Sequence, residues 1–415
     1  MNKKDILELK RRMKKTHCTF TKMCGCYVNA DKEIVLTIGE TFLNLAEEEL
    51  HKYLEIAGKT LSGTVGNNLL ELPFPKEEEQ SGGKQQFFMG LKESKLQNDA
   101  LLDTFYHLII DNYDYVGNYL ILIFHDAYDV IKKTKDNLDL DESEEVYEYL
   151  LGAVCPVTLT KAALGYLEQE SRFGSRQRDW VVGAPDTGFV FPAFTERSTD
   201  IHSVLYYTRD TKSPHPEFME HILGCPARQT ATEQKNTLED IVTGAVPDDE
   251  RRRDRVLYDI HETIHDMLEE RALYAEPEHE PEPILLTAQT IQDVLAASNV
   301  PEEIAARIED SYTETFTDIP PAADLIVDKK LLAAGAHIRK EEELMVEVQK
   351  LKDELAAAKT LSPSEPGASS CEVILTVAPD KVEQISAQVI DGKRCIIIPL
   401  NENEHASVNG EDNLI

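Results

Sequence analysis

The character of the chain changes near residue 245, and no other feature limits the fold as strongly. Before this point, short apolar runs alternate with segments of helical periodicity. After it, charged helical segments dominate until a last β-rich stretch. We therefore expect an α+β protein with a mixed α/β body, a helical region and a small C-terminal β module. The expected parts are a basic N-terminal helix at 1–16, a core domain at 17–244, a helical region at 245–360 with an acidic proline-rich spacer at 276–283, a linker at 361–370 and the β module at 371–415.

Local patterns predict the elements of these parts. In the core domain they are a hairpin within 26–38, helices at 43–57 and 99–112, a buried strand at 119–124, a helix from Ser143 through Leu151 that ends before Pro156, and a helical turn at 217–223 closed by Gly224. Farther on they are helices at 248–275, at 290–316 with a break at Pro301 and at 331–359, and a hairpin around Asp391 and Gly392. The helix after Ser143 is predicted because two glutamates follow the serine, a pattern typical of a helix start.

The formal net charge of −33 limits the partners of this chain of 415 residues. A field of this sign repels nucleic acid and anionic membranes at long range, so binding to either must be local. Basic segments lie at 1–15 and 251–255, although such runs are more often solvated helix faces. No apolar run is long enough to span a bilayer, and the N-terminus lacks the apolar core of a signal peptide. We expect a cytoplasmic protein without a membrane partner, whose seven cysteines are reduced thiols.

The segment 172–207 concentrates arginines and aromatic residues and holds the only tryptophan. RDWVVG is typical of a strand that enters a Gly-Ala-Pro-Asp turn, after which extended structure resumes at Phe189 and ends at Pro192. Because arginine holds phosphates and aromatic rings stack on bases, the segment is a candidate nucleic-acid or nucleotide site. The alternative is that the aromatics are core residues and each arginine is paired with a neighbouring acid. The candidate ligand-binding residues are Arg172, Arg176, Arg178, Trp180, Arg197 and Tyr206.

A candidate metal site lies where the buried strand ends. His125 and Asp126 follow the strand, and they could meet Asp200 and His202 from the DIH segment. Histidines and carboxylates bind divalent metals that support hydrolysis, for example of phosphodiesters. Ordinary polar capping of a strand end and turn formation are the alternative interpretation.

The pentapeptide HETIH has the pattern of a zinc peptidase. On a helix, His261 and His265 would share one face and bind zinc while Glu262 acted as general base. The motif lacks the usual downstream histidine, and the glutamates that follow it lie in a proline-rich spacer, a poor place for a rigid third ligand. We therefore interpret it as a chance match.

Three cysteines near the N-terminus, Cys18, Cys24 and Cys26, lie close enough to His17 to suggest a metal site. Their spacing fits no common zinc pattern, and the segment continues into a strand-like run. Because free cysteine is among the most buried residue types, a structural cysteine cluster is the favoured interpretation. No motif strongly implies a cofactor.

The helix expected at 331–359 carries Leu344, Val348, Leu351 and Leu355 at alternating spacings of four and three. This spacing is typical of a coiled-coil seam, although about two heptads are too few to prove one. Self-association through this helix is one interpretation, and packing of the helix against the body is the other.

Several motifs together resemble a known family. They are CGCYVN at 24–29, FHDAYDV at 124–130, CPV at 155–157, RDWVVGAPDTGFVFPAF at 178–194, DIHSVLYY at 200–207, LGC at 223–225 and VIDGKRCIII at 389–398. Over nearly the whole chain they are similar to the bacterial family known as domain of unknown function 4317. The resemblance implies a cytosolic protein of Firmicute-type bacteria, and it implies no known activity, cofactor or active site.

The layout also resembles that of nucleoid-associated proteins of the NdpA type. Those proteins are acidic, have an apolar strand that ends in a histidine-containing turn comparable to YLILIFHDAYD, and finish with a small strand-turn-strand module. No DNA-contacting residue carries over to this sequence.

Three hypotheses from different classes remain. The favoured one is a non-enzymatic binding protein with nucleic acid as its partner, and it predicts binding that weakens steeply with salt. The second is a metal-dependent hydrolase at His125, Asp126, Asp200 and His202 or at the HETIH helix, and it predicts bound metal. The third is an adaptor whose helices and β module bind other proteins, and it predicts neither.

Overall fold

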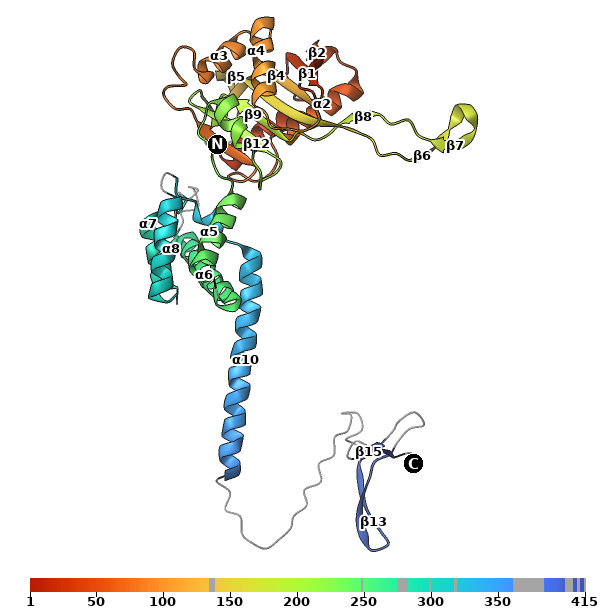
Figure 1. Ribbon diagram of the computed structural model, residues 1–415, viewed down its shortest axis with the longest axis vertical. Helices are drawn as coiled ribbons and strands as arrows, with labels where there is room; N and C mark the ends of the chain where they lie inside the picture. The colour runs from red at the N-terminus through yellow and green to blue at the C-terminus, as the bar shows by residue number, and fades with distance from the viewer. Residues whose placement is uncertain are drawn as a thin grey trace. The chain divides into compact units, whose positions relative to one another are not determined.

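The computed structural model describes residues 1–133, 139–247, 249–274, 283–298, 300–316, 319–360, 384–399, 406–408 and 411–413. The chain divides into two compact units, Met1–Lys340 and Glu341–Ile415. The first unit holds a large sheet and two groups of helices, and the second holds the outer part of the last helix and two small hairpins (Figure 1). The expected linker at 361–370 and the expected spacer, apart from Pro283, lie outside the described residues.

One antiparallel sheet forms the body of the first unit. Its strand order is β2-β1-β4-β5-β9-β12-β3, and β8 also pairs with β5. The mixed α+β class, the hairpin within 26–38 and the strand at 119–124 are therefore confirmed. The strands are β1 Lys22–Val28, β2 Ile34–Thr41, β3 Leu69–Pro73, β4 Asn118–Lys133, β5 Asp139–Leu159, β8 Trp180–Val182, β9 Thr187–Phe191 and β12 Ser203–Thr208.

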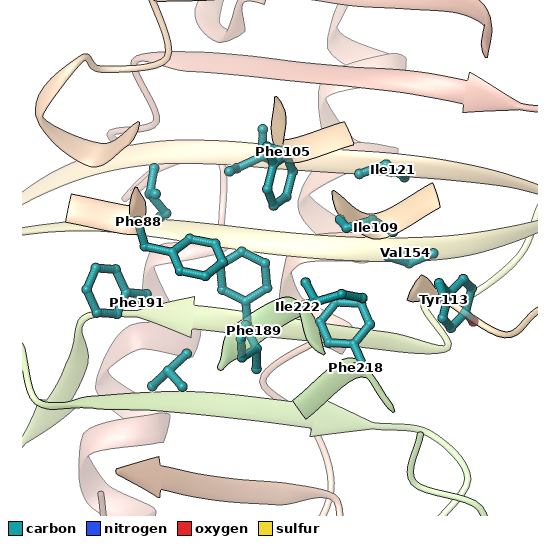
Figure 2. Packing of buried hydrophobic residues seen from close by; sticks show 14 of the residues in the cluster. Phe88, Phe105, Ile109, Tyr113, Ile121, Val154, Phe189, Phe191, Phe218 and Ile222 are labelled. Atoms are coloured by element: carbon teal, nitrogen blue, oxygen red, sulfur yellow. The ribbon is translucent and has the colours of Figure 1, made fainter. Parts of the chain in front are cut away.

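Helices cover both faces of this sheet. On one face α3 (Lys84–Glu93), α4 (Asp99–Asn112) and the π-helix η3 (Phe218–Leu223) enclose a core rich in aromatic rings (Figure 2). On the other face lie α1 (Lys3–Arg12), the short helix η1 (Phe42–Asn44) and α2 (Glu47–Lys59).

The central strand β4 contributes to both cores. Ile121 and Ile123 belong to the first, and Leu122 and Phe124 belong to the second. A strand that is buried on both faces needs apolar residues at every position. This explains why its sequence is a continuous apolar run rather than an alternating one.

The helix expected from Ser143 through Leu151 is wrong, because these residues belong to β5, which pairs with β4 along most of its length. Tyr147, Tyr149 and Leu151 are spaced by two and are fully buried in the same core. Their burial on one face of the sheet outweighs the local helix-start signal. The period of two is present in the sequence beside the competing local signal of the serine and the glutamates.

Pro156 lies within β5 and does not end it. It interrupts the pairing along one edge of β5, between β9 and β8. Its carbonyl accepts a hydrogen bond of 2.8 Å from the N–H of Gly183, but proline has no N–H to return. The pairing along this edge accordingly stops, with β9 ending its ladder at Val154 and β8 beginning at Val157. The predicted strand, turn and strand thus follow one another along the same edge of β5.

A helical cluster completes the first unit. Its members share a third apolar core, and Pro301 caps α8, which confirms the break in helix predicted there. None of the described helices is both long and apolar enough to cross a membrane. The helices are α5 Ala231–Ala245, α6 Glu250–Tyr274, α7 Ala288–Ala297, α8 Glu302–Thr315, α9 Ala323–Ile326 and the first part of α10 Lys329–Thr360.

The second unit contains the predicted hairpin. β13 (Ser386–Ile390) pairs with β14 (Lys393–Ile397) across Asp391 and Gly392, whose φ angles are 51° and 77°. Two consecutive positive φ angles are what a tight two-residue hairpin turn requires, which is why Asp-Gly predicts it. A second pair, β15 (Ala406–Val408) with β16 (Glu411–Asn413), follows.

Candidate nucleic-acid interface

A two-stranded ribbon leaves the sheet between β5 and β8, and we call its residues 160–179 the arm (Figure 1). Between the ladder of β5 with β8 and the outer ladder of β6 with β7, the N–H of Thr160 donates to the carbonyl of Asp179 and that of Arg176 to Ala163, at 2.9 Å each. From the pair Leu159 and Trp180 to the pair Leu164 and Ser175, both segments of the arm have the same number of residues, so no residue is inserted on either side. The outer part consists of β6 Leu164–Leu167, the short helix η2 Glu168–Glu170 and β7 Arg172–Ser175.

The outer ladder gathers two arginines of the arm on one face. Arg172 and Arg176 lie on the side of the ribbon that carries Gly165 and Gly174. Arg178 and Trp180 continue the spacing of two along the chain, and by residue count Lys161 lies opposite Arg178. We call the four cations and Trp180 the basic face. By the same count the acids of the arm lie at its tip or out of phase with these five residues.

Most of these cations are available to a ligand. Arg178 donates from Nε to the carbonyl of Thr160 at 2.7 Å, and Arg172 forms an ion pair of 2.5 Å with Glu170 at the tip. In the part of the chain that the structure describes, no ion pair involves Lys161 or Arg176. All five residues of the basic face are exposed, which is the opposite of what core packing predicts.

Two glycines, Gly165 and Gly174, face each other across the arm on this same side. The side chain of Arg176 adjoins Gly165, and the guanidinium of Arg172 covers Gly174. Glycine in a strand often marks a place where a ligand or another backbone approaches closely. The pair instead lets the side chains of Arg172 and Arg176 lie directly against the ribbon backbone.

The opposite face of the arm is apolar. Leu164, Tyr166 and Phe173 are 80%, 57% and 75% exposed, and the two rings lie opposite each other with centroids 5.6 Å apart. Exposed apolar patches of this kind mark contact surfaces. The arm therefore presents a basic face and an aromatic face.

Two of the six predicted ligand-binding residues lie elsewhere. Arg197, between β10 (Ala193–Thr195) and β11 (Ser198–Asp200), has its Nε 3.0 Å from the carboxylate of Glu8 in α1. Tyr206 is fully buried, and its hydroxyl donates to the carbonyl of Pro214 at 2.7 Å. For these two residues the alternative interpretation applies, a paired arginine and a core aromatic. The prediction of one site containing all six is wrong, and the other four belong to the basic face.

The basic N-terminal helix is α1, and it packs on the sheet through Ile6 and Leu9. Arg12 turns inward, with Nε 3.7 Å from the carboxylate of buried Asp126 and its guanidinium over the ring of Tyr128. The other cations of the segment are exposed, as a solvated helix face requires; they are Lys3, Lys4, Lys10, Arg11, Lys14 and Lys15.

His125 and Asp126 have structural partners. The ring of His125 lies between the hydroxyl of Thr21 at 2.7 Å and the carboxylate of Glu148 at 2.8 Å. Asp126 accepts a hydrogen bond of 2.8 Å from the hydroxyl of Tyr149. Both residues are buried, which suits polar capping of a strand inside the core.

Asp200 and His202 do not join them. The pairings across β5 and β9 place His125 level with the beginning of β12, three strands away, which is roughly 14 Å at the usual strand spacing. His202 is exposed and pairs instead with Glu79 at 2.7 Å, which raises the pKa of its ring. Among the described residues, no three His, Cys, Asp or Glu side chains gather in a way that could hold a metal.

The HETIH residues serve the helical cluster. His261 is buried, and its Nδ1 accepts the N–H of Asp328 at 3.2 Å; burial lowers the pKa of its ring to about 4. Glu262 pairs with Arg339 of α10 at 2.7 Å, and His265 lies 3.4 Å from the glutamate one turn later. The two imidazoles have different partners and different environments. These contacts agree with a chance match to the zinc motif.

The N-terminal cysteines are packed as small apolar groups. Cys24 and Cys26 lie in β1 and point into the core beneath α4, and Cys18 is partly buried. Burial raises the pKa of Cys26 to about 12 and that of Cys18 to about 11. Thiols with such pKa values are protonated and unreactive at neutral pH, as the structural interpretation expects.

A buried ionic cluster at the start of β9 was not anticipated. Asp186 accepts hydrogen bonds from Arg209 at 2.7 Å, from the hydroxyl of Tyr113 at 2.9 Å and from His215 at 3.1 Å, and the other ring nitrogen of His215 lies 2.8 Å from Glu217. The bond to His215 lowers the pKa of Asp186. Burial alone would lower the pKa of His215, but its two carboxylate partners raise it. The cluster thereby ties the start of β9 to the segments that carry Arg209 and His215.

Comparison with known proteins gives one match. The family model described as domain of unknown function (DUF4317) matches residues 1–411. No curated protein and no solved structure matches the chain. The layout similarity to nucleoid-associated proteins of the NdpA type therefore stays a prediction.

Proposed function

We propose that the chain, which belongs to the DUF4317 family as its motifs predicted, is a non-enzymatic nucleic-acid-binding protein that acts through the basic face of the arm. The exposure of the arm supports this most, because four cations and the indole of Trp180 all lie exposed along one short two-stranded ribbon and its base. The cations would bind backbone phosphates, and a base would stack on the indole. A nucleoid-associated role follows if the ligand is duplex DNA.

The arm reduces the electrostatic problem that the net charge of −33 creates. Its legs run about ten residues beyond the sheet, which corresponds to roughly 33 Å of extended chain. At 0.1 M salt a charge is screened beyond about 10 Å, so the outer arm lies largely outside the repulsive field of the acidic body. Local binding of a polyanion is therefore compatible with the overall composition.

The shape of the arm fits both forms of nucleic acid. The major groove of duplex DNA, about 12 Å wide, accepts a two-stranded ribbon. A single strand, in contrast, is held by cations along its backbone and by aromatic rings under its bases. Both forms share the phosphodiester backbone, so we expect the basic face to contact either form. The titration described below distinguishes them.

The salt dependence of binding is the quantitative consequence. If Lys161, Arg172, Arg176 and Arg178 each neutralise one phosphate, the slope of log K against log salt is about −3.6 for duplex and about −2.8 for single strands. Removing two of the four arginine or lysine charges should halve that slope. Steep slopes near −8 or beyond would need more phosphate contacts than the arm offers.

The test is a titration of the full chain with short labelled duplex DNA, single-stranded DNA and RNA at two salt concentrations. The fluorescence of Trp180, the only tryptophan, is recorded in parallel, since it reports a ligand bound at the base of the arm. The Arg176→Ala/Arg178→Ala variant should lose at least tenfold in affinity and about half of the salt slope.

The matched control is Arg251→Ala/Arg252→Ala, which removes the same charge from an exposed turn of α6. It should bind as the wild type does. Equal losses in both variants would refute the role of the arm, since they would indicate non-specific charge attraction. No binding at low salt would refute the nucleic-acid proposal altogether and point to a protein ligand for the arm.

A cytoplasmic location is part of the proposal. The six cysteines that lie in described parts of the chain are all free thiols, which suits a reducing compartment. Self-association is a separate proposal that does not depend on nucleic acid, and α10 supports it.

A further inference from the structure

The last helix, α10, has two parts with different surroundings. In its first part Leu331 and Leu332 pack on the helical core, Gly335 adjoins the ring of Tyr258, and Arg339 pairs with Glu262. For this part of the helix the interpretation of packing against the body applies, because it contacts α6 and the core of the helical cluster.

The second part of α10 presents an apolar stripe without a partner in the described chain. Leu344, Val348 and Leu351 are 53%, 48% and 57% exposed, and they are spaced by four and three. Leu355 and Ala358 continue this spacing in the sequence. A stripe with an average period of 3.5 is the seam of a coiled coil, and it needs a second helix to cover it.

We propose that a second copy of this chain covers the stripe, in a parallel two-stranded coiled coil that begins at Leu344. In heptad notation Val348 lies at position a, and Leu344 and Leu351 lie at position d. A β-branched residue at a with leucine at d is the combination that favours parallel dimers. The contacts of Leu331, Leu332 and Arg339 with the helical cluster lie before this seam.

The charges beside the stripe identify the partner as a parallel copy. Glu347 lies at position g and Lys352 at position e, and in a parallel dimer each g residue faces the e residue of the next heptad on the other helix. Glu347 would then face Lys352 of the partner subunit, and the symmetry repeats this pair. In the sequence, Glu354 and Lys359 repeat the same relation one heptad later.

An antiparallel pair would bring like charges together, because position g then faces g and position e faces e. Glu347 would approach the partner's Glu354, and lysines at e would approach each other. Neither Glu347 nor Lys352 has an ion-pair partner among the residues that are described, so both are available for the pairing. The charge pattern therefore favours parallel self-association and disfavours the alternative.

The test measures the molar mass of the full chain by sedimentation over a hundredfold range of concentration. The wild type should shift from monomer to dimer, and Val348→Glu/Leu351→Glu should stay monomeric throughout. The matched control, Val346→Glu/Gln349→Glu, adds the same two charges on the outer face of the helix and should dimerise as the wild type does. A monomeric wild type, or equal loss in the control, would overturn the proposal.

A charge exchange tests the orientation. Glu347→Lys alone should weaken the dimer at least severalfold, because it places two lysines at each g–e contact, and adding Lys352→Glu should restore it. In an antiparallel dimer the single variant would instead relieve a repulsion and tighten association, which would overturn the parallel arrangement. Nucleic-acid binding by the monomeric variant is measured separately, so failure of one proposal is distinguishable from failure of the other.

Discussion

His261 should make the helical cluster sensitive to acid. Its side chain is only 2% exposed in the third core, and its Nδ1 accepts the N–H of Asp328, which requires a neutral ring. Burial is the largest cause of the lowered pKa, which falls from 6.5 to about 4. Protonation would bury a charge and replace the acceptor by a donor that faces another N–H.

The sign of the effect follows from which state binds the proton. In the unfolded chain His261 is protonated below about pH 6.5, whereas in the folded chain it stays neutral down to about pH 4. Between these values the unfolded state holds more protons, so the free energy of unfolding falls as the pH falls. At 1.36 kcal/mol per pH unit, the loss is about 2 kcal/mol at pH 5 and about 3 kcal/mol below pH 4.

The assay is urea denaturation followed by helical circular dichroism at neutral pH and near pH 5. In the His261→Asn variant the amide oxygen takes the place of Nδ1 and does not titrate, so the variant should lose about 2 kcal/mol less than the wild type over this range. The control His265→Asn lies one turn later and is more exposed, and it should behave as the wild type does. An equal loss in wild type and His261→Asn would refute the reasoning.

Two further changes probe the sheet and the ionic cluster. In Gly152→Ala the new methyl carbon would lie 2.2 Å from the ring of buried Phe189, so the midpoint of urea unfolding should fall by the equivalent of about 1–3 kcal/mol, while Gly39→Ala, with nothing within 4 Å, should change it little. The pKa of His215 is raised by its carboxylate partners, so its stabilisation is fully present below about pH 6.5 and is lost as the pH rises through the folded value. His215→Gln should therefore destabilise the protein more at pH 6 than at pH 9, and a deficit independent of pH would contradict this assignment.

Local signals in the sequence predicted elements whose cause is itself local. Asp391 and Gly392 formed the expected turn because both residues tolerate a positive φ, and Pro301 began a helix where its missing N–H costs nothing. The apolar run 119–124 predicted a buried strand, because no solvated element of that length tolerates six apolar residues in succession. The helix expected after Ser143 failed because burial of alternate tyrosines on the sheet outweighs a helix-start signal.

The candidate site likewise depends partly on local sequence and partly on long-range pairing. By itself, the sequence determined which residue types were concentrated near Trp180, and hence what chemistry the segment offers. Only the tertiary structure decided which of them share a surface, because that depends on the pairing partner of each strand. Pairing across the arm left Arg172 and Arg176 exposed on one side, whereas pairing within the sheet buried Tyr206, and α1 neutralised Arg197. A strand's side chains alternate between faces whatever the fold, but the register with distant strands determines which face meets water.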